Sequence, residues 1–134
     1  MRKSQDGFTI VEVMSAVLLF MIGITAIMSV CIDSKNAAQR AEYAYYAYNI
    51  AKNRIETLRS MAFSDLASGG ESETLVDASG VSSLNGAYSR TTVVTNPYGG
   101  DANLTQLTVT VYYTFRGQQS AQPMQMTTVV FSGG

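Results

Sequence analysis

The sequence has 134 residues, of which 46% are hydrophobic, so it has room for one small folded domain beside any membrane segment. Its formal net charge of −1 gives no reason to expect binding to nucleic acid, and its lack of histidine excludes the Ser-His and Cys-His arrangements of hydrolytic enzymes. Metal-ligand spacings and phosphate-binding glycine loops are also missing, so we expect neither an enzyme nor a protein with a cofactor or a metal ion.

The first element along the chain is an apolar run behind a short polar leader. The leader contains Arg2 and Lys3 and ends at Gly7. The residues from Val13 to Ile32 carry no charge, and as a helix these 20 residues would be about 30 Å long, the thickness of the hydrocarbon core of a bilayer. Because the basic leader precedes the span, we expect the leader in the cytoplasm and the rest of the chain on the other side of the membrane.

Three interpretations of this run differ in what they explain. A secretory signal peptide has an apolar region of roughly 7–15 residues and a small-residue cleavage site, whereas this run is longer and ends in Ser29-Val30-Cys31-Ile32. A plain membrane anchor explains the length but gives no reason for Glu12, since a carboxylate in an apolar span is costly and usually serves a function. The third interpretation is based on a resemblance to a known family.

The residues Gly7, Phe8, Thr9 and Glu12, behind a basic leader and before about twenty apolar residues, resemble the start of type IV prepilins. The resemblance implies that a prepilin peptidase cleaves after Gly7, that Phe8 becomes the N-methylated N-terminus, and that Glu12 and Phe8 serve assembly. The sequence supports the role of Glu12 independently, because no Lys or Arg lies between Phe8 and Ile32. The ammonium of Phe8, in the same chain or in a neighbour, is then the expected partner of Glu12.

The helical pattern continues beyond the span. Residues 33–62 contain neither proline nor glycine, and their apolar residues recur at steps of three and four, with charged residues such as Arg54 mostly off this stripe. The predicted stripe consists of Ala41, Ala44, Tyr48, Ala51, Ile55, Leu58 and Ala62. The tyrosines that crowd this segment are expected to pack against the head or against neighbouring subunits: Tyr43, Tyr45, Tyr46 and Tyr48. We predict one helix from Phe8 to Phe63, about 84 Å long and without a proline kink.

The remainder of the chain predicts a connector and a small sheet. Residues 64–87 are rich in Ser, Gly, Asp and Glu, as in a loop, with a short strand near Thr74–Val76. Alternating apolar and polar residues predict strands at Tyr88–Thr95, Leu104–Phe115 and Met124–Phe131. The apolar face of the middle strand comprises Leu107, Val109, Val111, Tyr113 and Phe115. The predicted fold class is therefore α+β: a long N-terminal helix, its first half transmembrane, packed on a small antiparallel β-sheet head, as in pilins.

We divide the chain into a prepilin leader (1–7), a transmembrane and assembly half of the helix (8–32), an amphipathic half (33–63), and a connector with the sheet head (64–134). The resemblance implies a minor pilin or pseudopilin that prepilin peptidase processes and that assembles through its helix into a type IV pilus. Two alternatives stay open. One is a pseudopilus subunit of a type II secretion or DNA-uptake system, and the other is a binding module displayed at the filament tip.

The same resemblance implies the partners and the location. The expected partners are other pilin or pseudopilin subunits, prepilin peptidase, the inner-membrane assembly platform and the membrane itself. We expect a single-pass protein of the inner (cytoplasmic) membrane with its head in the periplasm, which then enters a pilus or pseudopilus. Nucleic acid is not an expected partner, because Arg90 and Arg116 are the only basic residues after Arg59.

Overall fold

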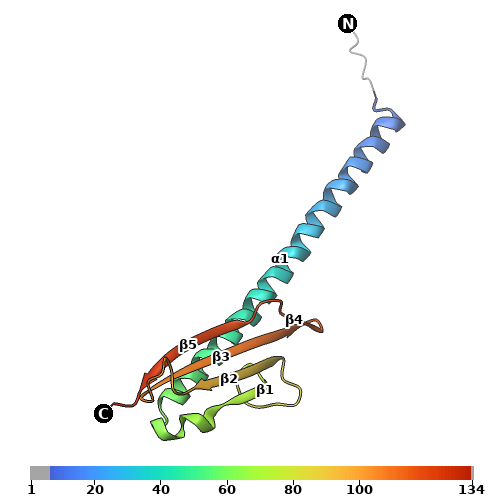
Figure 1. Ribbon diagram of the computed structural model, residues 1–134. Helices are drawn as coiled ribbons and strands as arrows, with labels where there is room; N and C mark the ends of the chain where they lie inside the picture. The colour runs from blue at the N-terminus through green and yellow to red at the C-terminus, as the bar shows by residue number, and fades with distance from the viewer. Residues whose placement is uncertain (1–6, 134) are drawn as a thin grey trace. The chain divides into compact units, whose positions relative to one another are not determined.

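The computed structural model describes residues 7–133, so the predicted leader, except for Gly7, lies outside the described residues. Helix α1 (Ile10–Arg59) is followed by the short 3-10 helix η1 (Phe63–Gly69) and by an antiparallel sheet (Figure 1). The strands are β1 (Glu71–Val76), β2 (Tyr88–Thr95), β3 (Leu104–Phe115), β4 (Gln118–Gln119) and β5 (Met124–Phe131). The α+β class, with its long N-terminal helix and antiparallel sheet, is confirmed.

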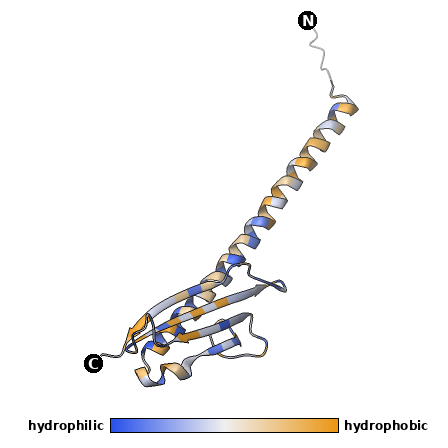
Figure 2. Ribbon diagram, in the orientation of Figure 1, coloured by the Kyte–Doolittle hydropathy of each residue, from blue (hydrophilic) through white to orange (hydrophobic). Residues whose placement is uncertain are grey.

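The chain divides between Gln39 and Arg40 into two compact units, and the first of them contains the N-terminal part of α1. Every apolar residue from Val13 to Ile32 is exposed in this unit. Figure 2 shows apolar residues recurring along this part of the helix. Within residues 7–133, α1 is the one helix that is long and apolar enough to cross a membrane.

The second unit contains the rest of α1 and the sheet. The strands lie in the order β1-β2-β3, with β5 on the other side of β3 and β4 paired with the end of β3. In register, Tyr88 of β2 lies opposite Tyr113 of β3, and Met124 of β5 lies opposite Val111. The predicted bounds of β2, β3 and β5 are confirmed. Helix η1 and strand β4 were not predicted, and β1 is longer than the short strand predicted near Thr74–Val76.

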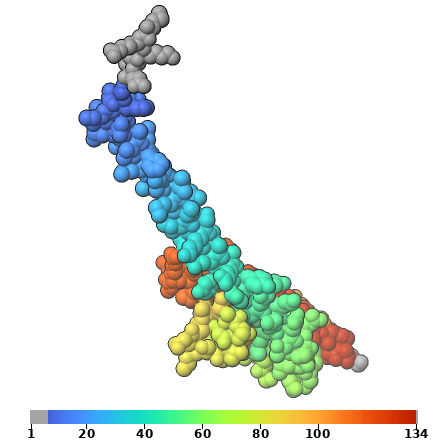
Figure 3. All heavy atoms as spheres, turned by 180° about the vertical axis from the view of Figure 1, so that it is seen from behind, coloured from blue at the N-terminus to red at the C-terminus, as the bar shows by residue number. Residues whose placement is uncertain are grey.

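The core of the second unit lies between α1 and one face of the sheet. Its helix residues are Ala47, Ile50, Ala51, Ile55 and Leu58, and its strand residues include Val76, Tyr88, Leu107, Val109 and Val111. Figure 3, which shows the molecule from behind, has α1 and the following connector covering the sheet from that side. The predicted apolar face of β3 is therefore confirmed.

The predicted helix stripe is correct only between Ala51 and Leu58. Ala51, Ile55 and Leu58 are buried, but Ala41, Tyr48 and Ala62 are exposed. Toward the N-terminus the packed stripe continues through the buried Ala47 and the half-buried Tyr43. An average of 3.6 residues per turn allows the step of four from Ala51 to Ala47 as well as the predicted step of three to Tyr48.

The helix is also shorter than the predicted span from Phe8 to Phe63. It begins at Ile10, because Thr9 caps its first turn, and it ends at Arg59. Beyond that point, Ser60 and Met61 close turns onto Thr57 and Leu58 through three-residue hydrogen bonds. The chain then continues into η1, so the helix-forming residues 60–63 are used for a tighter turn.

A half-buried cluster of charges joins α1 to the sheet. The carboxylate of Glu71, at the start of β1, accepts hydrogen bonds from the guanidinium of Arg90 and from the hydroxyl of Thr92, both on β2. Arg54 of α1 pairs with the same carboxylate at 3.1 Å and donates to the carbonyl of Gly69 at 2.9 Å. The expectation that the charged residues lie off the packed face is therefore wrong for Arg54, whose charge is neutralised inside.

The loop after β1 is closed by one aspartate. Asp77 accepts hydrogen bonds through Oδ1 from the hydroxyl and the N–H of Ser79 and from the N–H of Val81. The hydroxyl of Ser79 is the largest cause that lowers the pKa of Asp77 below its usual 3.8. This turn presents the carbonyl of Gly80 to Arg90, which donates to it from Nη1 at 3.0 Å.

Candidate functional site

The predicted assembly residues lie at the N-terminal end of α1. Gly7, Phe8 and Thr9 precede the helix without regular structure. The carbonyl of Thr9 accepts from the N–H groups of Glu12 and Val13 at 3.1 and 3.2 Å, and its hydroxyl accepts from the N–H of Glu12 at 3.3 Å. Thr9 is thus the N-cap and Glu12 the third helical residue, the T-x-x-E spacing of a capping box. This capping role of Thr9 and Glu12 was not predicted, although their spacing is visible in the sequence.

Glu12 lies where a negative charge favours the helix, because the first turn carries the positive end of the helix dipole. Its side chain is exposed and forms no ion pair with any other residue from Gly7 to Gly133. Phe8 is 82% exposed. In the uncleaved chain the nitrogen of Phe8 belongs to a peptide bond, so an ion pair with Glu12 requires cleavage first.

Gly7 is not required by the fold. A Cβ atom on Gly7 would have no neighbour within 4 Å. Gly86 gives the contrast, because a Cβ atom there would collide with the backbone of Val76. Any requirement for glycine at position 7 therefore comes from a molecule that acts on this segment.

The four tyrosines of α1 separate into two groups. Tyr43 points into the second unit, where its ring centre lies 6.0 Å from Tyr88, 6.1 Å from Tyr113 and 5.6 Å from Phe115. The other three are exposed: Tyr45, Tyr46 and Tyr48. Packing against the head thus explains Tyr43, and among the exposed three the ring centres of Tyr45 and Tyr46 lie 6.1 Å apart.

The N-terminal segment matches a known family model. A family model described as the prokaryotic N-terminal methylation motif matches residues 2–28, which include Gly7, Phe8 and Glu12. This match marks a type IV prepilin-like protein, and the helix-then-sheet fold is consistent with a pilin or pseudopilin. No curated protein and no solved structure gives a significant match.

The motif has general consequences for the kind of protein this is. It indicates a structural subunit, with pilin-type subunits and a prepilin peptidase as partners in general. Together with the exposed apolar part of α1, it also indicates anchoring in a membrane.

Proposed function

We propose that this protein is a minor pilin or pseudopilin that is cleaved after Gly7, N-methylated at Phe8 and assembled through α1 into a type IV pilus or a related pseudopilus. One observation carries the proposal: a helical run without charge, exposed from Val13 to Ile32, begins directly behind a single first-turn carboxylate, Glu12. Such a helix needs lipid around it before assembly and neighbouring helices after assembly.

The carboxylate of Glu12 can fix the axial position of one apolar helix relative to the next. Apolar contacts between helices are similar at many axial offsets, whereas an ion pair in a medium of low dielectric constant forms at one. Cleavage creates the ammonium of Phe8 four residues before Glu12. Pairing Glu12 of one subunit with Phe8 of the next sets the register of the filament.

The proposal includes the topology and the division of the chain given above. The leader (1–7) stays in the cytoplasm, residues 8–32 cross the inner membrane, and residues 33–134 lie in the periplasm. A minor subunit is favoured over a bulk subunit, because the head is small and has no disulfide and α1 contains no proline.

A binding module for DNA at a filament tip has less support. Of the two basic residues after Arg59, Arg90 is 7% exposed and its guanidinium is held by Glu71 and by the carbonyl of Gly80. That leaves Arg116 as the single exposed basic residue of the sheet region, too few for a surface that follows a phosphate backbone.

Mass spectrometry of the N-terminus, on protein from membranes or sheared filaments, tests the proposal. We expect a methylated Phe8 as the first residue. Gly7→Leu should leave the precursor in the membrane, although the fold tolerates the side chain. Gly23→Leu is the matched control, because a Cβ there also has no neighbour within 4 Å, and its cleavage should be normal. A mature chain that begins at Met1 or near Val30 would contradict the proposal.

A further inference from the structure

Arg40 is an exposed cation of the second unit. Its guanidinium carbon lies 5.8 Å from the centre of the Phe115 ring, which is within the range of cation–π attraction. Arg40 forms no ion pair with another residue from Gly7 to Gly133. Because the ring attracts the charge through its face, the N–H groups of the guanidinium remain available to an acceptor. Arg40 can therefore bind a carboxylate while it contacts Phe115.

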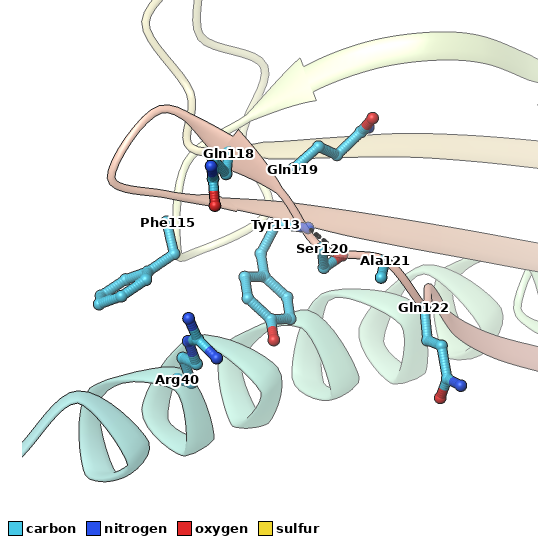
Figure 4. Close-up of a pocket in the computed structure, with 8 residues that line it drawn as sticks. All are labelled: Arg40, Tyr113, Phe115, Gln118, Gln119, Ser120, Ala121 and Gln122. Atoms are coloured by element: carbon cyan, nitrogen blue, oxygen red, sulfur yellow. Dashed lines mark hydrogen bonds between the residues drawn. The ribbon is translucent and has the colours of Figure 1, made fainter. Parts of the chain in front are cut away.

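Arg40 borders a pocket of about 380 Å³. The pocket is lined by Arg40, Tyr113, Phe115 and residues 118–122, none of which is acidic (Figure 4). In Figure 4 the guanidinium of Arg40 lies beside the rings of Phe115 and Tyr113. The hydroxyl of Ser120 accepts from the N–H of Tyr113 at 3.3 Å, which leaves its own hydrogen free to donate. A guanidinium with a hydroxyl donor in the same pocket suits a carboxylate, which accepts two parallel hydrogen bonds from an arginine.

The pocket lies at one edge of the sheet, at the end of β3. The N–H of Thr114 donates to the carbonyl of Ala87, directly before β2. The carbonyl of the preceding residue, Tyr113, instead accepts from the N–H of Ser120. Successive residues of a strand direct their backbone groups to opposite sides, so Ser120 lies on the side of β3 away from β2. β5 pairs with β3 on that same side, so the pocket belongs to the edge formed by β4 and β5.

The outer edge of β5 lacks the features that usually keep an edge strand from pairing. The N–H of Ser132 donates to the carbonyl of Asn103, in register with the β3–β5 ladder, so the even-numbered residues of β5 bond β3. The odd-numbered residues direct their N–H and C=O groups outward. β5 contains no charged residue and no proline, and its register with β3 is unbroken. An uncharged, regular edge of this kind is expected to contact another chain.

The opposite edge of the sheet presents an unpaired acid. Glu73 of β1 is exposed and forms no ion pair with another described residue. Its φ of 42° lies in the left-handed region, where the register of β1 and β2 shifts, and its N–H donates to the hydroxyl of Thr91 at 3.3 Å. Glu73 is thus held in a conformation that residues other than glycine seldom adopt, and its carboxylate has no cationic partner within residues 7–133.

The other carboxylates of the second unit do not match the pocket as Glu73 does. Glu42 lies only two residues after Arg40 on α1, and not at the opposite edge of the sheet. The remaining acids of this unit already have partners within it: Glu56, Asp65, Glu71, Asp77 and Asp101. Among the described residues, Glu73 is therefore the unpaired carboxylate at the β1 edge.

The two edges of the sheet meet when two copies of the head lie side by side in the same orientation. β1 runs antiparallel to β2, β2 to β3 and β3 to β5. In an equally oriented neighbour, β1 is therefore antiparallel to the β5 strand beside it, and residues 40–59 of α1 run in the same direction in both copies. Pairing two β5 edges about a two-fold axis would reverse this helix segment in one copy, whereas the subunits of the proposed filament share one direction.

We propose that the Arg40 pocket at the β4–β5 edge binds the Glu73 carboxylate of a second copy of this chain. The two charges are complementary, and neither has an ion-pair partner within residues 7–133. Each copy offers the pocket at one edge and the acid at the other, so the contact can repeat from copy to copy. The orientation of the copies rests on the proposed assembly through α1. The contact itself requires neither cleavage at Gly7 nor the role of Glu12.

Cross-linking between two differently tagged full-length chains in cell membranes tests the contact. Both chains carry Cys31→Ser, which removes the native thiol. One chain carries Ser72→Cys, at the exposed position before Glu73, and the other carries Gln118→Cys, in the pocket lining. We expect a short bismaleimide to link the two chains through these cysteines.

Charge reversal shows whether the link depends on the proposed pair. Arg40→Glu in the chain with the pocket cysteine, or Glu73→Arg in the other chain, should reduce the yield of the link by about fivefold. The two reversals together should restore the link, because the pair forms again with exchanged charges. Arg59→Glu is the matched control: it reverses an exposed charge of the same helix, outside the pocket lining, and should leave the yield unchanged.

Other outcomes overturn the proposal in defined ways. Equal losses from Arg40→Glu and Arg59→Glu would mean general charge attraction, and failure of the double reversal to restore the link would exclude the pair. Links between two Gln118→Cys chains in place of the mixed link would mean a two-fold contact. Gly7→Leu, which should block processing, should leave the link intact. Absence of the link with a normally methylated Phe8 would overturn this inference alone, whereas a linked chain that keeps its leader would contradict only the proposed processing.

Discussion

Arg90 donates two hydrogen bonds to Glu71, from Nε to Oε2 at 2.8 Å and from Nη2 to Oε1 at 3.0 Å. The side chain of Arg90 is 8% exposed and that of Glu71 is 21% exposed, so this two-point ion pair is largely removed from water. A pair in this setting is much more sensitive to the loss of one partner than a pair on the surface. The carboxylate also neutralises Arg54, so its loss affects two cations.

Replacing Glu71 by glutamine should destabilise the second unit by about 2–3 kcal/mol, because two half-buried guanidinium groups then have no counter-charge. Urea unfolding of the full chain in micelles, followed by the near-ultraviolet circular dichroism of the tyrosines, measures the free energy of unfolding. Glu73→Gln is the control on the same strand. Glu73 is exposed and forms no ion pair with the residues that the structure describes, so its change should stay within about 0.5 kcal/mol. Similar losses in both variants would assign the effect to overall charge.

Val111→Asp should cost several kcal/mol and abolish the cooperative melting of the head. Val111 is fully buried against the helix, and an aspartate there places a charge or an unpaired acid among apolar side chains. Thr114→Asp introduces the same side chain on the same strand at an exposed position and should melt almost normally. An unaltered melting curve for Val111→Asp would contradict the assignment of the packed face of β3.

The head should lose stability at alkaline pH through Tyr88. Burial, followed by the nearby charges of Tyr43, Tyr46 and Glu42, raises the pKa of Tyr88 from 10.0 to about 12. The folded state keeps this proton longer than the unfolded state, so the contribution is complete below pH 10 and is lost as the pH rises through about 12. Tyr88→Phe should show a smaller fall in the free energy of unfolding over this pH range. Its difference spectrum against the unchanged protein should lack the tyrosinate that forms near pH 12, and an equal fall in both proteins would exclude Tyr88 as the cause.

Glu12→Gln separates two roles of this residue. Glutamine keeps the N3 side chain of a capping box but removes the charge. If Glu12 sets the filament register through the Phe8 ammonium, the glutamine variant should insert into the membrane and be cleaved after Gly7, yet be poorly incorporated into filaments. Glu12→Asp, shorter but still charged, should be partly competent, and Glu12→Ala should assemble as poorly as the glutamine variant.

Membrane fractionation and blots of sheared filaments measure the two steps of that prediction. Normal incorporation of the glutamine variant together with failure of the alanine variant would assign Glu12 to helix capping. In that case Thr9→Val, which removes the capping hydroxyl, should reproduce the defect of the alanine variant. Loss of membrane insertion in any of these variants would contradict the topology of the span.

The sheet was predictable because its signals are local. Alternation along β3 places Leu107, Val109 and Val111 on one face whatever the strand pairs with, and turn residues mark the ends of β2 and β5. The first turn of α1 was less well predicted, because Thr9 and Glu12 were interpreted only through the family resemblance and not as the two members of a capping box.

The charge cluster could not be predicted in the same way. Arg54 and Glu71 lie 17 positions apart and Glu71 and Arg90 lie 19 apart, so no periodicity relates them. Only the close approach of α1, β1 and β2 shows that these charges neutralise one another. The buried face of α1 was predicted wrongly before Ala51 for a related reason. Small alanines and amphipathic tyrosines fit on either side of a helix, and packing against the sheet decides which side is buried.

The sharing of Glu71 by three segments has a consequence for how the head opens. When β1 leaves β2, Arg90 loses its counter-charge, and when α1 leaves β1, Arg54 loses the same counter-charge. Separating β1 from β2 and separating α1 from β1 therefore both cost free energy. The connector, β1 and the last turns of α1 are thus expected to unfold as one cooperative unit. Amide hydrogen exchange should show the same opening free energy for β1 as for the α1 segment around Ile55, and Glu71→Gln should lower both together.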